Sequence, residues 1–371
     1  MLVVGAGISG CTAAYNLACR EVRVTLVEKA HEIGGRVRAY GCKAADKCQN
    51  CGVCLVGSLW DKVMAHQGIH LLTNATVVEV TGAPGNFTVT IDCAVCEASV
   101  SKCAVTDNTD KTNKKLCLDA IDKIVVSTGF DSQSSGVFSH LHIEETTKAS
   151  GFSKASEATK PTRFNGIITG TELEKLLLRR TRAKLFETAP ESVAFVQCLG
   201  SRDENESGLY CSRVCCAYST RAAKLIRSYY PDCEIVFFYM ELQNVEPGNF
   251  YEGLRELGAE FIKCRPLKII EGNIAPDTPA INSAVTIEYD DPVMGIKSRN
   301  FDIAILSDGI RAAASNDKLA EIFMLGQDKE GFLNTIGTDC GIYVTGCAKA
   351  PMKIEEAYVD AIKTAGEVSY K

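Results

Sequence analysis

The chain opens with M-L-V-V-G-A-G-I-S-G (Met1–Gly10), and this stretch decides the fold of its first domain. An apolar run leads directly into a G-x-G-x-x-G motif formed by Gly5, Gly7 and Gly10. Glycines at these positions allow a tight turn between a strand and a helix, and they let the backbone approach a pyrophosphate. The motif alone is a weak signal, because the same glycines can serve a tight turn that binds no ligand.

The residues around the motif strengthen its interpretation. A helical pattern of apolar residues extends from Ile8 to Arg20, and a second apolar run, Val22–Val27, ends at Glu28. Amide donors at a helix N-terminus favour a phosphate, and an acidic residue at the end of the second strand can accept hydrogen bonds from a ribose. The segment therefore predicts a β-α-β dinucleotide-binding unit, and Glu28 argues against a 2′-phosphate.

Three further segments resemble those of flavoproteins that bind two dinucleotides. I-G-G-R-V-R (Ile33–Arg38) carries a second glycine pair, S-T-G ends at Gly129, and a turn at Gly346 precedes the last helical pattern. In those flavoproteins the glycine pair lines the FAD pyrophosphate, the segment that matches Val77–Glu79 contacts adenine, and the late turn contacts the flavin. The resemblance therefore implies FAD. The residue after the late glycine is usually aspartate in that group, and here it is Cys347.

Composition limits the function classes. The chain has 371 residues, of which 46% are hydrophobic and 23% charged, and this length allows two or three domains. The formal net charge of −6 indicates no basic face, so we expect no nucleic-acid partner. No apolar run approaches the roughly 18 residues of a membrane span, and we expect no signal peptide. With 18 cysteines, such a chain favours a reducing cytoplasm and metal, cluster or thiol chemistry.

Four cysteines lie in Q-C-L-G-S-R-D-E-N-E-S-G-L-Y-C-S-R-V-C-C-A-Y-S (Gln197–Ser219), spaced as C-x12-C-x3-C-C. The apolar run Val193–Val196 predicts a strand, and the pattern over 209–229 predicts a helix in which Cys211 and Cys215 share a face. Several thiolates at such a junction indicate a site for zinc or an iron–sulfur cluster. The alternative is that these are buried structural cysteines that bind no metal. Two adjacent cysteines fit two irons of a cubane better than one tetrahedral zinc.

The same stretch lies in the first turn of a second predicted β-α-β unit, because a strand pattern follows at Cys233–Tyr239. An ordinary NAD(P)H-dependent reductase carries its glycine fingerprint at this turn, but here Q-C-L-G-S-R-D stands in that place. We infer that the second domain has a cluster site where its relatives have a dinucleotide site.

Two other cysteine groups allow several interpretations. The run C-x5-C-x2-C-x2-C (Cys42–Cys54) follows the second glycine pair, as redox-active cysteines do in flavin disulfide reductases. It can form a thiol–disulfide pair, hold a cluster or metal, or be a structural loop with free thiols. The second group flanks a polar, lysine-rich stretch that indicates a solvated loop, although its spacing also allows a metal site; its members are Cys93, Cys96, Cys103 and Cys117.

Nearly the whole chain resembles the A-type subunits of heterodisulfide reductases. The resemblance rests on the glycine motif, the cysteine run at 42–54, F-V-Q-C-L-G-S-R-D and Y-C-S-R-V-C-C around the four cysteines, L-S-D-G at 306–309 and T-G-C-A-K-A-P at 345–351. In that family the four cysteines bind a [4Fe–4S] cluster close to FAD on a thioredoxin-reductase-like core, usually in a dimer. The cluster ligands that the resemblance implies are Cys198, Cys211, Cys215 and Cys216. It also implies that Arg221, where the family favours lysine, places a cation near the flavin.

The chain departs from the large archaeal members, which add an N-terminal extension and ferredoxin-type C-x2-C-x2-C-x3-C-P runs. It resembles the short form found in complexes that oxidise sulfur compounds, and the alternative is the A-type subunit of a quinone-interacting oxidoreductase complex in sulfate reduction. A third alternative is a stand-alone NAD(P)H-dependent flavin disulfide reductase that uses Cys48 and Cys51, although we find no NAD site.

These observations predict an α/β fold with two Rossmann-like domains of the thioredoxin-reductase type, an FAD-binding domain at 1–145 plus 300–371 and a cluster-binding domain at 165–295. The expected function is electron transfer through FAD and a [4Fe–4S] cluster in a cytoplasmic complex for sulfur-compound oxidation. B- and C-type subunits are the expected partners, and the chain is expected to form a homodimer or an A-type pseudodimer. The residues expected to bind FAD are Gly5, Gly7, Ile8, Ser9, Gly10, Glu28, Lys29, Gly34, Gly35, Arg36, Val78, Thr128, Gly129, Gly346, Cys347, Met352, Lys353 and Ile354. The candidate catalytic residues are Arg221 and Lys353.

Overall fold

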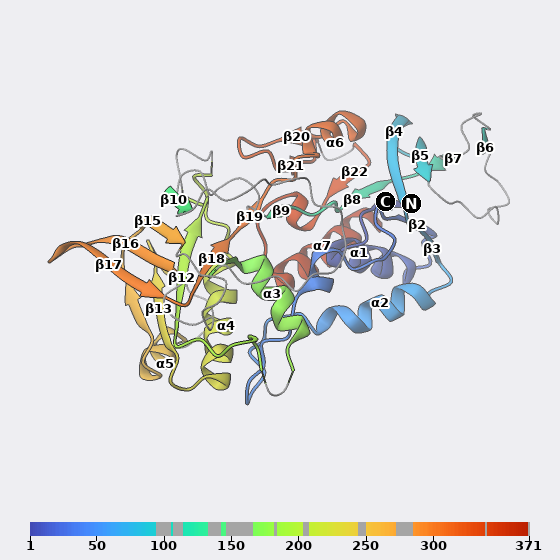
Figure 1. Cartoon of the computed structure of the whole chain (residues 1–371). Helices are drawn as coiled ribbons and strands as arrows, with labels where there is room; N and C mark the ends of the chain where they lie inside the picture. Colours follow the sequence, from blue (N-terminus) through green and yellow to red (C-terminus); the bar gives the residue numbers. More distant parts are fainter. Residues whose placement is uncertain are drawn as a thin grey trace. The chain divides into compact units, whose positions relative to one another are not determined.

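The chain divides into two compact units. The computed structural model describes residues 1–93, 105–106, 114–132, 142–145, 166–181, 184–202, 208–243, 250–271, 285–337 and 340–369. Unit 1 consists of Met1–Tyr40, Gly52–Asp131 and Ile310–Lys371, and unit 2 consists of Gly41–Cys51 and Ser132–Gly309 (Figure 1). Residues 300–309, which we expected in the first domain, therefore lie in unit 2, as does the short segment Gly41–Cys51.

Unit 1 is built on a five-stranded parallel sheet with the strand order β22-β8-β1-β2-β3. Its strands are β1 (Leu2–Val4), β2 (Val24–Val27), β3 (Ile69–Leu72), β8 (Ile124–Val126) and β22 (Ile342–Val344). The side chains of β1 alternate between the two faces of the sheet. Val3 packs against helices α1 (Ile8–Ala18), α2 (Leu55–Ala65) and α7 (Ile354–Ser369), whereas Leu2 and Val4 face a second sheet.

The second sheet of unit 1 is antiparallel, with the order β4-β5-β7-β6. Its strands are β4 (Ala75–Ala83), β5 (Asn86–Cys93), β6 (Val105–Thr106) and β7 (Lys114–Ile121). The remaining elements of the unit are η1 (Gly35–Ala39), β19 (Ile310–Arg311), α6 (Asn316–Phe323), β20 (Gly326–Gln327), β21 (Leu333–Asn334) and η3 (Gly346–Ala348), and β9 (Asp131–Ser132) lies at the boundary of the two units.

Unit 2 repeats this layered plan. Its parallel sheet has the order β11-β18-β12-β13-β14, formed by β11 (Ile167–Thr169), β12 (Ser192–Leu199), β13 (Glu234–Phe238), β14 (Glu260–Ile262) and β18 (Ile303–Asp308). One face is covered by α3 (Gly170–Arg179), α4 (Cys215–Tyr229) and α5 (Phe250–Glu256). The other face packs against strands of a second sheet, which consists of β10 (His142–Glu145), β15 (Pro266–Glu271), β16 (Val285–Asp291) and β17 (Gly295–Phe301).

The helix predicted over 209–229 begins later than expected. α4 starts at Cys215, and Arg213 has a φ of +63°, so the backbone is left-handed two residues before the helix. Cys211 therefore lies in the preceding loop, and the predicted helix face shared by Cys211 and Cys215 is wrong. α3 begins with a capping box, in which Thr169 Oγ1 accepts from Glu172 N at 3.1 Å and Glu172 Oε2 accepts from Thr169 N at 2.7 Å.

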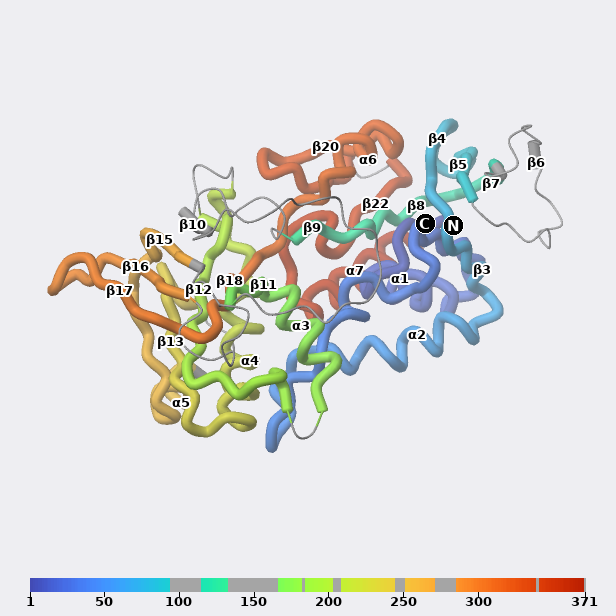
Figure 2. The backbone as a smooth tube through the Cα atoms, in the orientation of Figure 1, coloured from blue at the N-terminus to red at the C-terminus, as the bar shows by residue number. Residues whose placement is uncertain are grey.

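The segment Gly41–Cys51 runs beside α3 and α4 of unit 2, where Figure 2 shows it in blue. Gly41 allows close approach to α3, since a Cβ there would lie 2.4 Å from the Cβ of Leu177. Lys43 Nζ lies 2.6 Å from Glu174 Oε1, and both side chains are buried, with 3% and 8% of their surface exposed. Buried ion pairs of this kind fix an arrangement more than they stabilise it. Among the described residues, no helix has the length and apolar character needed to cross a membrane.

Candidate functional site

The glycine motif of unit 1 forms a tight turn at the carboxyl end of β1. Gly5 has a φ of +94°, and a Cβ on it would lie 2.5 Å from Ser127 O. A Cβ on Gly10 would lie 1.7 Å from Gly5 O, so α1 packs against the strand at this point only because residue 10 is glycine. Ser127 Oγ holds the turn by donating to the carbonyls of Val4 and Gly5 at 2.8 and 2.9 Å.

The N-terminus of α1 suits an anionic ligand. Its N-cap, Gly7, makes no side-chain cap, and the first turn contains no acidic residue. A Cβ on Gly7 would meet no heavy atom within 4 Å, so this glycine borders open space. Free amide donors and the positive end of the helix dipole at an open position are the features that bind a pyrophosphate.

Two other predicted glycine segments meet this turn. Gly34 N donates to Ala6 O at 2.7 Å, and a Cβ on Gly35 would lie 3.0 Å from the Cα of Gly7. Gly346 has a φ of +65°, and a Cβ on it would lie 2.0 Å from Ser9 Oγ. The structure therefore brings three glycine segments, far apart in sequence, to one edge of the parallel sheet.

The predicted ribose ligand, Glu28, also supports the loop. Its Oε2 accepts from Ala6 N at 2.7 Å and its Oε1 accepts from Ala30 N at 2.9 Å. Each carboxylate oxygen keeps a second lone pair, so these bonds leave room for a hydroxyl donor. Within the described part of the chain, the buried Thr128 Oγ1 has no hydrogen-bond partner, and the neighbouring Gly129 borders open space. An orphaned hydroxyl here fits a polar ligand, so this set of residues fits FAD.

Asp360, which we did not predict, fixes the turn at Gly346. Its Oδ2 accepts from Thr345 Oγ1 at 2.8 Å and from Gly346 N at 2.9 Å, and Lys349 Nζ lies 3.4 Å from its Oδ1. The aspartate expected directly after the glycine is thus absent, but a carboxylate from α7 reaches the same turn. No local sequence signal marks it, because a carboxylate in the second turn of a helix usually faces solvent.

The other residues predicted to bind FAD have varied surroundings. Ile8, Met352 and Ile354 pack in one apolar cluster with Val37 and Val56. Burial raises the pKa of the Cys347 thiol to about 11. Arg36 binds Phe130 O through Nε at 2.7 Å and Asp131 Oδ1 through Nη2 at 3.0 Å. Lys353 N donates to Glu356 Oε2, Lys29 is exposed, and Val78 lies where the register of β4 and β5 shifts.

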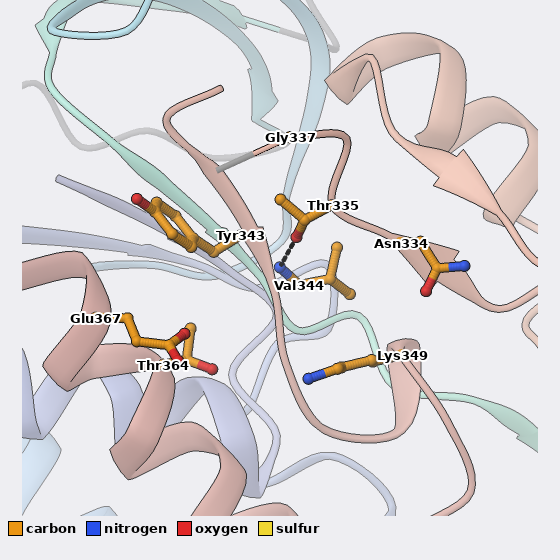
Figure 3. Close-up of a pocket in the computed structure, with 8 residues that line it drawn as sticks. All are labelled: Asn334, Thr335, Gly337, Tyr343, Val344, Lys349, Thr364 and Glu367. Atoms are coloured by element: carbon orange, nitrogen blue, oxygen red, sulfur yellow. Dashed lines mark hydrogen bonds between the residues drawn. The ribbon is translucent and has the colours of Figure 1, made fainter. Parts of the chain in front are cut away.

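A cavity of about 840 Å³ lies in unit 1 beside β22 and includes none of the predicted residues. Figure 3 shows polar side chains around it, and the hydroxyl of Thr335 accepts from Val344 N at 3.3 Å. Its lining residues are Asn334, Thr335, Gly337, Tyr343, Val344, Lys349, Thr364 and Glu367. We assign it no ligand.

In unit 2, the four predicted cluster ligands gather at the β12–α4 junction. Cys198 lies in β12 with a φ of +61°, at a shift of register between β12 and β18, and Cys215 and Cys216 form the start of α4. The two ends of the loop between them are joined by a 2.7 Å hydrogen bond between the hydroxyls of Ser201 and Ser212. The bond holds the two ends of the loop together. Cys211, which precedes Ser212, lies close enough to Cys198 for their thiols to interact electrostatically.

The thiols of this junction interact electrostatically with one another. Burial raises the pKa of Cys198 to about 11, and the neighbouring thiols of Cys216 and Cys211 contribute. Burial likewise raises the pKa values of Cys215 and Cys216. The positive charge of Arg202 opposes the rise at Cys198. Buried thiols of this kind are inert until a metal displaces their protons.

In the described part of the chain, the four thiols are not arranged around a single metal ion. Among the described residues, no group of three or more His, Cys, Asp or Glu side chains is placed to hold one metal ion. A [4Fe–4S] cluster binds each thiolate to a different iron, so its ligands lie farther apart than the ligands of one ion. α4 also begins without a side-chain cap and without an acidic residue in its first turn, which favours an anionic group at that end. The [4Fe–4S] cluster assigned to these four cysteines stays a prediction.

The other two cysteine groups are divided among different elements of the fold. Cys42, Cys48 and Cys51 lie in the segment that belongs to unit 2, whereas Cys54 is the N-cap of α2 in unit 1. Cys93 ends β5, and Cys117 lies in the neighbouring strand β7. The other two members of that group, Cys96 and Cys103, lie outside the described residues.

Arg221 of α4 is buried, and its guanidinium binds the cysteine segment of unit 2. Nε donates to Gln49 O at 2.8 Å and Nη2 donates to Asn50 O at 3.1 Å. The role predicted for Arg221 beside a flavin stays a prediction.

Comparison with known proteins agrees with this fold. Residues 3–50 match the family of NAD(P)-binding Rossmann-like domains. Crystal structures of thioredoxin reductase from T. acidophilum and Lactococcus lactis superpose with TM-scores of 0.58 and 0.56 at 14% and 13% identity. Each of these superpositions covers 99% of this chain and 96% of the other. The predicted fold, with two Rossmann-like units of the thioredoxin-reductase type, is therefore confirmed.

Sequence similarity is higher to a different group. The chain is 28% identical to an A-type iron–sulfur subunit of the CoB–CoM heterodisulfide reductase of Methanopyrus kandleri, over 95% of this chain and 61% of that protein. It is also 28% identical to the A-type subunit of the H2:CoB–CoM heterodisulfide, ferredoxin reductase of Methanothermobacter thermautotrophicus, over 97% and 62%. The chain thus spans about three fifths of the length of these relatives. Along nearly its whole length, the chain is therefore similar to A-type subunits of heterodisulfide reductases.

Proposed function

We propose that the chain is an electron-transfer subunit that binds FAD in unit 1 and a [4Fe–4S] cluster in unit 2. The observation that carries this proposal is the set of four cysteines at the β12–α4 junction, Cys198, Cys211, Cys215 and Cys216. This junction is the first turn of a β-α-β unit, where a nicotinamide-binding domain has glycines. A protein with a cluster at this place accepts or donates single electrons there.

The residues of unit 1 have distinct roles in this proposal. Amides at the start of α1 bind the pyrophosphate, and Glu28 accepts from a ribose hydroxyl while it supports the loop. Thr128 gives its unpartnered hydroxyl to the ligand, and Asp360 fixes the turn that faces the flavin. Lys353 and the start of α7 lie next to that turn. Bound FAD supplies the exchange between two-electron and one-electron chemistry, and bound [4Fe–4S] carries single electrons.

The relatives are named as subunits of larger reductases, and we propose that this chain also works in a complex. B- and C-type subunits of a heterodisulfide-reductase-like complex are the partners we propose, with two A-type chains at its core. The setting we propose is oxidation of sulfur compounds, and an A-type role in a quinone-interacting complex is the alternative. Co-purification of the chain with a thiol-handling or a quinone-binding subunit distinguishes these two settings.

Metal and flavin content test the central proposal. The anaerobically reconstituted chain is expected to hold about four irons and four sulfides, together with FAD. Cys211→Ser and Cys215→Ala should lose most of the iron and keep the flavin, because the two cofactors bind in different units. The matched control is Cys264→Ser, since this residue is another half-buried thiol of unit 2 that lies outside the junction.

Two results would contradict the proposal. One is a Cys211→Ser variant with the iron content of the original chain. The other is rapid bleaching of the flavin when NADH is added to the isolated chain, which would favour a pyridine-nucleotide disulfide reductase.

A further inference from the structure

The segment Gly41–Cys51 carries a C-x2-C pair that the proposed electron transfer does not use. Cys48 is exposed, Cys51 is half-buried, and both are free thiols. The backbone N–H of Asn50 donates to Cys48 Sγ at 3.4 Å. Cys48 Sγ also donates to Asn50 Oδ1 at 3.7 Å, so Asn50 fixes the position of the Cys48 side chain.

Arg221 holds the turn between these two cysteines on α4. Its side chain is 93% buried, and its guanidinium donates to the carbonyls of Gln49 and Asn50, the two residues between Cys48 and Cys51. Gln49 Nε2 donates back to Arg221 O at 3.2 Å, so the contact is reciprocal. A cation fixed by two backbone bonds therefore lies at the turn that joins the two thiols.

Accessible cysteines in electropositive surroundings are the ones that react, and here Arg221 binds the two residues that separate Cys48 from Cys51. We propose that Cys48 and Cys51 are a dithiol site that reduces small disulfides, and that Arg221 is its positioning residue. Exposure makes Cys48 the attacking residue and leaves Cys51 to resolve the intermediate. This activity goes beyond the proposed electron transfer, because it needs neither FAD nor the cluster.

The reaction balances without another reductant. The Cys48 thiolate attacks one sulfur of R–S–S–R, the S–S bond breaks, and R–S⁻ leaves with the bonding electron pair and takes a proton from water. The Cys51 thiolate, having lost its proton to water, then attacks Cys48 Sγ and releases a second R–S⁻. Two cysteine thiols are oxidised to one disulfide, and one R–S–S–R is reduced to two R–SH.

The test uses the full chain, reduced and desalted without oxygen, with glutathione disulfide as the probe. Alkylation and peptide mass spectrometry are expected to show a Cys48–Cys51 disulfide and two glutathione molecules released per chain. Cys42 is a matched internal control, because it is exposed, lies in the same segment and accepts from Ala44 N at 3.4 Å, but is not part of a C-x2-C pair. Cys48 should react roughly tenfold faster than Cys42.

Variants separate the roles. In Cys51→Ser the reaction should stop at the mixed disulfide between Cys48 and glutathione. In Cys48→Ser, Cys51 should stay unmodified. Both variants should keep the iron and flavin content of the original chain. Arg221→Gln should slow the reaction of Cys48 roughly tenfold and leave that of Cys42 unchanged, and Arg221→Lys should restore part of the rate.

If the Arg221 variants do not fold, the two cysteine variants still decide whether the pair reacts. Equal rates at Cys48 and Cys42, or glutathione that stays on Cys48 in the original chain, would overturn the proposal. A change in iron content without a change in these rates bears on the electron-transfer proposal instead.

Discussion

Replacing Lys43 with methionine should destabilise unit 2, because it leaves a buried carboxylate without its cation. Lys43 Nζ lies 2.6 Å from Glu174 Oε1, and the two side chains are only 3% and 8% exposed. After the substitution, Glu174 keeps one hydrogen bond, from Gly41 N at 3.2 Å. Removing one partner of a buried pair costs about 3–5 kcal/mol. Lys43→Met should therefore lose most of that amount from the free energy of unfolding of unit 2.

A double variant tests whether the cost comes from the stranded charge. In Lys43→Met with Glu174→Gln, no charge is buried, and the glutamine oxygen can still accept from Gly41 N. We expect the double variant to regain about 2–3 kcal/mol relative to Lys43→Met alone. Amide hydrogen exchange in α3 and α4 reports on unit 2 separately from unit 1. If the losses of stability in Lys43→Met and Glu174→Gln sum to that of the double variant within about 0.5 kcal/mol, the reasoning is refuted, because the two side chains then do not interact.

The pH dependence of the same variants has a definite sign. Burial raises the pKa of Glu174 above its usual 4.5, and Lys43 opposes that rise. Without Lys43 the pKa in the folded state rises further, so the folded chain binds the proton more tightly than the unfolded chain. Such a group contributes stability below pH 4.5 that is lost as the pH rises through its folded pKa. The deficit of Lys43→Met should therefore shrink between pH 7 and pH 5, and the double variant, which has no carboxylate at residue 174, should not show this gain.

Three further substitutions test the turns that position the sites. Gly346→Ala should cost roughly 1–3 kcal/mol and weaken flavin retention, because φ is +65° and the new Cβ would lie 2.0 Å from Ser9 Oγ; adding Ser9→Gly should recover only the steric part. Asp360→Asn should cost about 1 kcal/mol through the loss of charge-assisted hydrogen bonds and raise the dissociation constant of FAD, measured by flavin fluorescence. Thr169→Ala should cost about 1 kcal/mol, seen as faster amide exchange in the first turn of α3, with iron and flavin content unchanged.

The elements around the glycine turn could be predicted from the sequence, because the residue type at each position there is determined by its local backbone conformation or by the periodicity of its strand or helix. Glycine is needed at Gly5 and Gly10, and the apolar runs on either side have strand and helix periods. The start of α4 had no such signal. Cys198, Arg202 and Arg213 all have positive φ values without being glycine, so composition did not mark the irregular backbone between β12 and α4. Their conformation depends on loop closure and on contacts that form only in the folded unit.

The assignment of Gly41–Cys51 to unit 2 was also beyond a sequence-based prediction. Lys43 follows a glycine pair of unit 1 and has the pattern of an ordinary surface lysine. Its partner, Glu174, lies 131 residues later, on an amphipathic helix where an acidic residue is expected to face water. Only the approach of Gly41 to α3 buries both groups. The predicted cysteine run is therefore split, with Cys48 and Cys51 held by α4 and Cys54 at the start of α2.

The two units use one backbone feature for two different ligands. α1 and α4 each follow a buried parallel strand, and each begins without a side-chain cap and without an acidic residue in its first turn. Both helix ends therefore offer amide donors and a positive dipole to an anionic group. In unit 1 the loop before the helix contains glycines, so the backbone itself approaches a pyrophosphate. In unit 2 the same position contains thiols, and the [4Fe–4S] cluster that we propose there would also be anionic. The FAD and the cluster that we propose are thus both anionic groups at a helix N-terminus, and the two loops differ in the groups that would bind them.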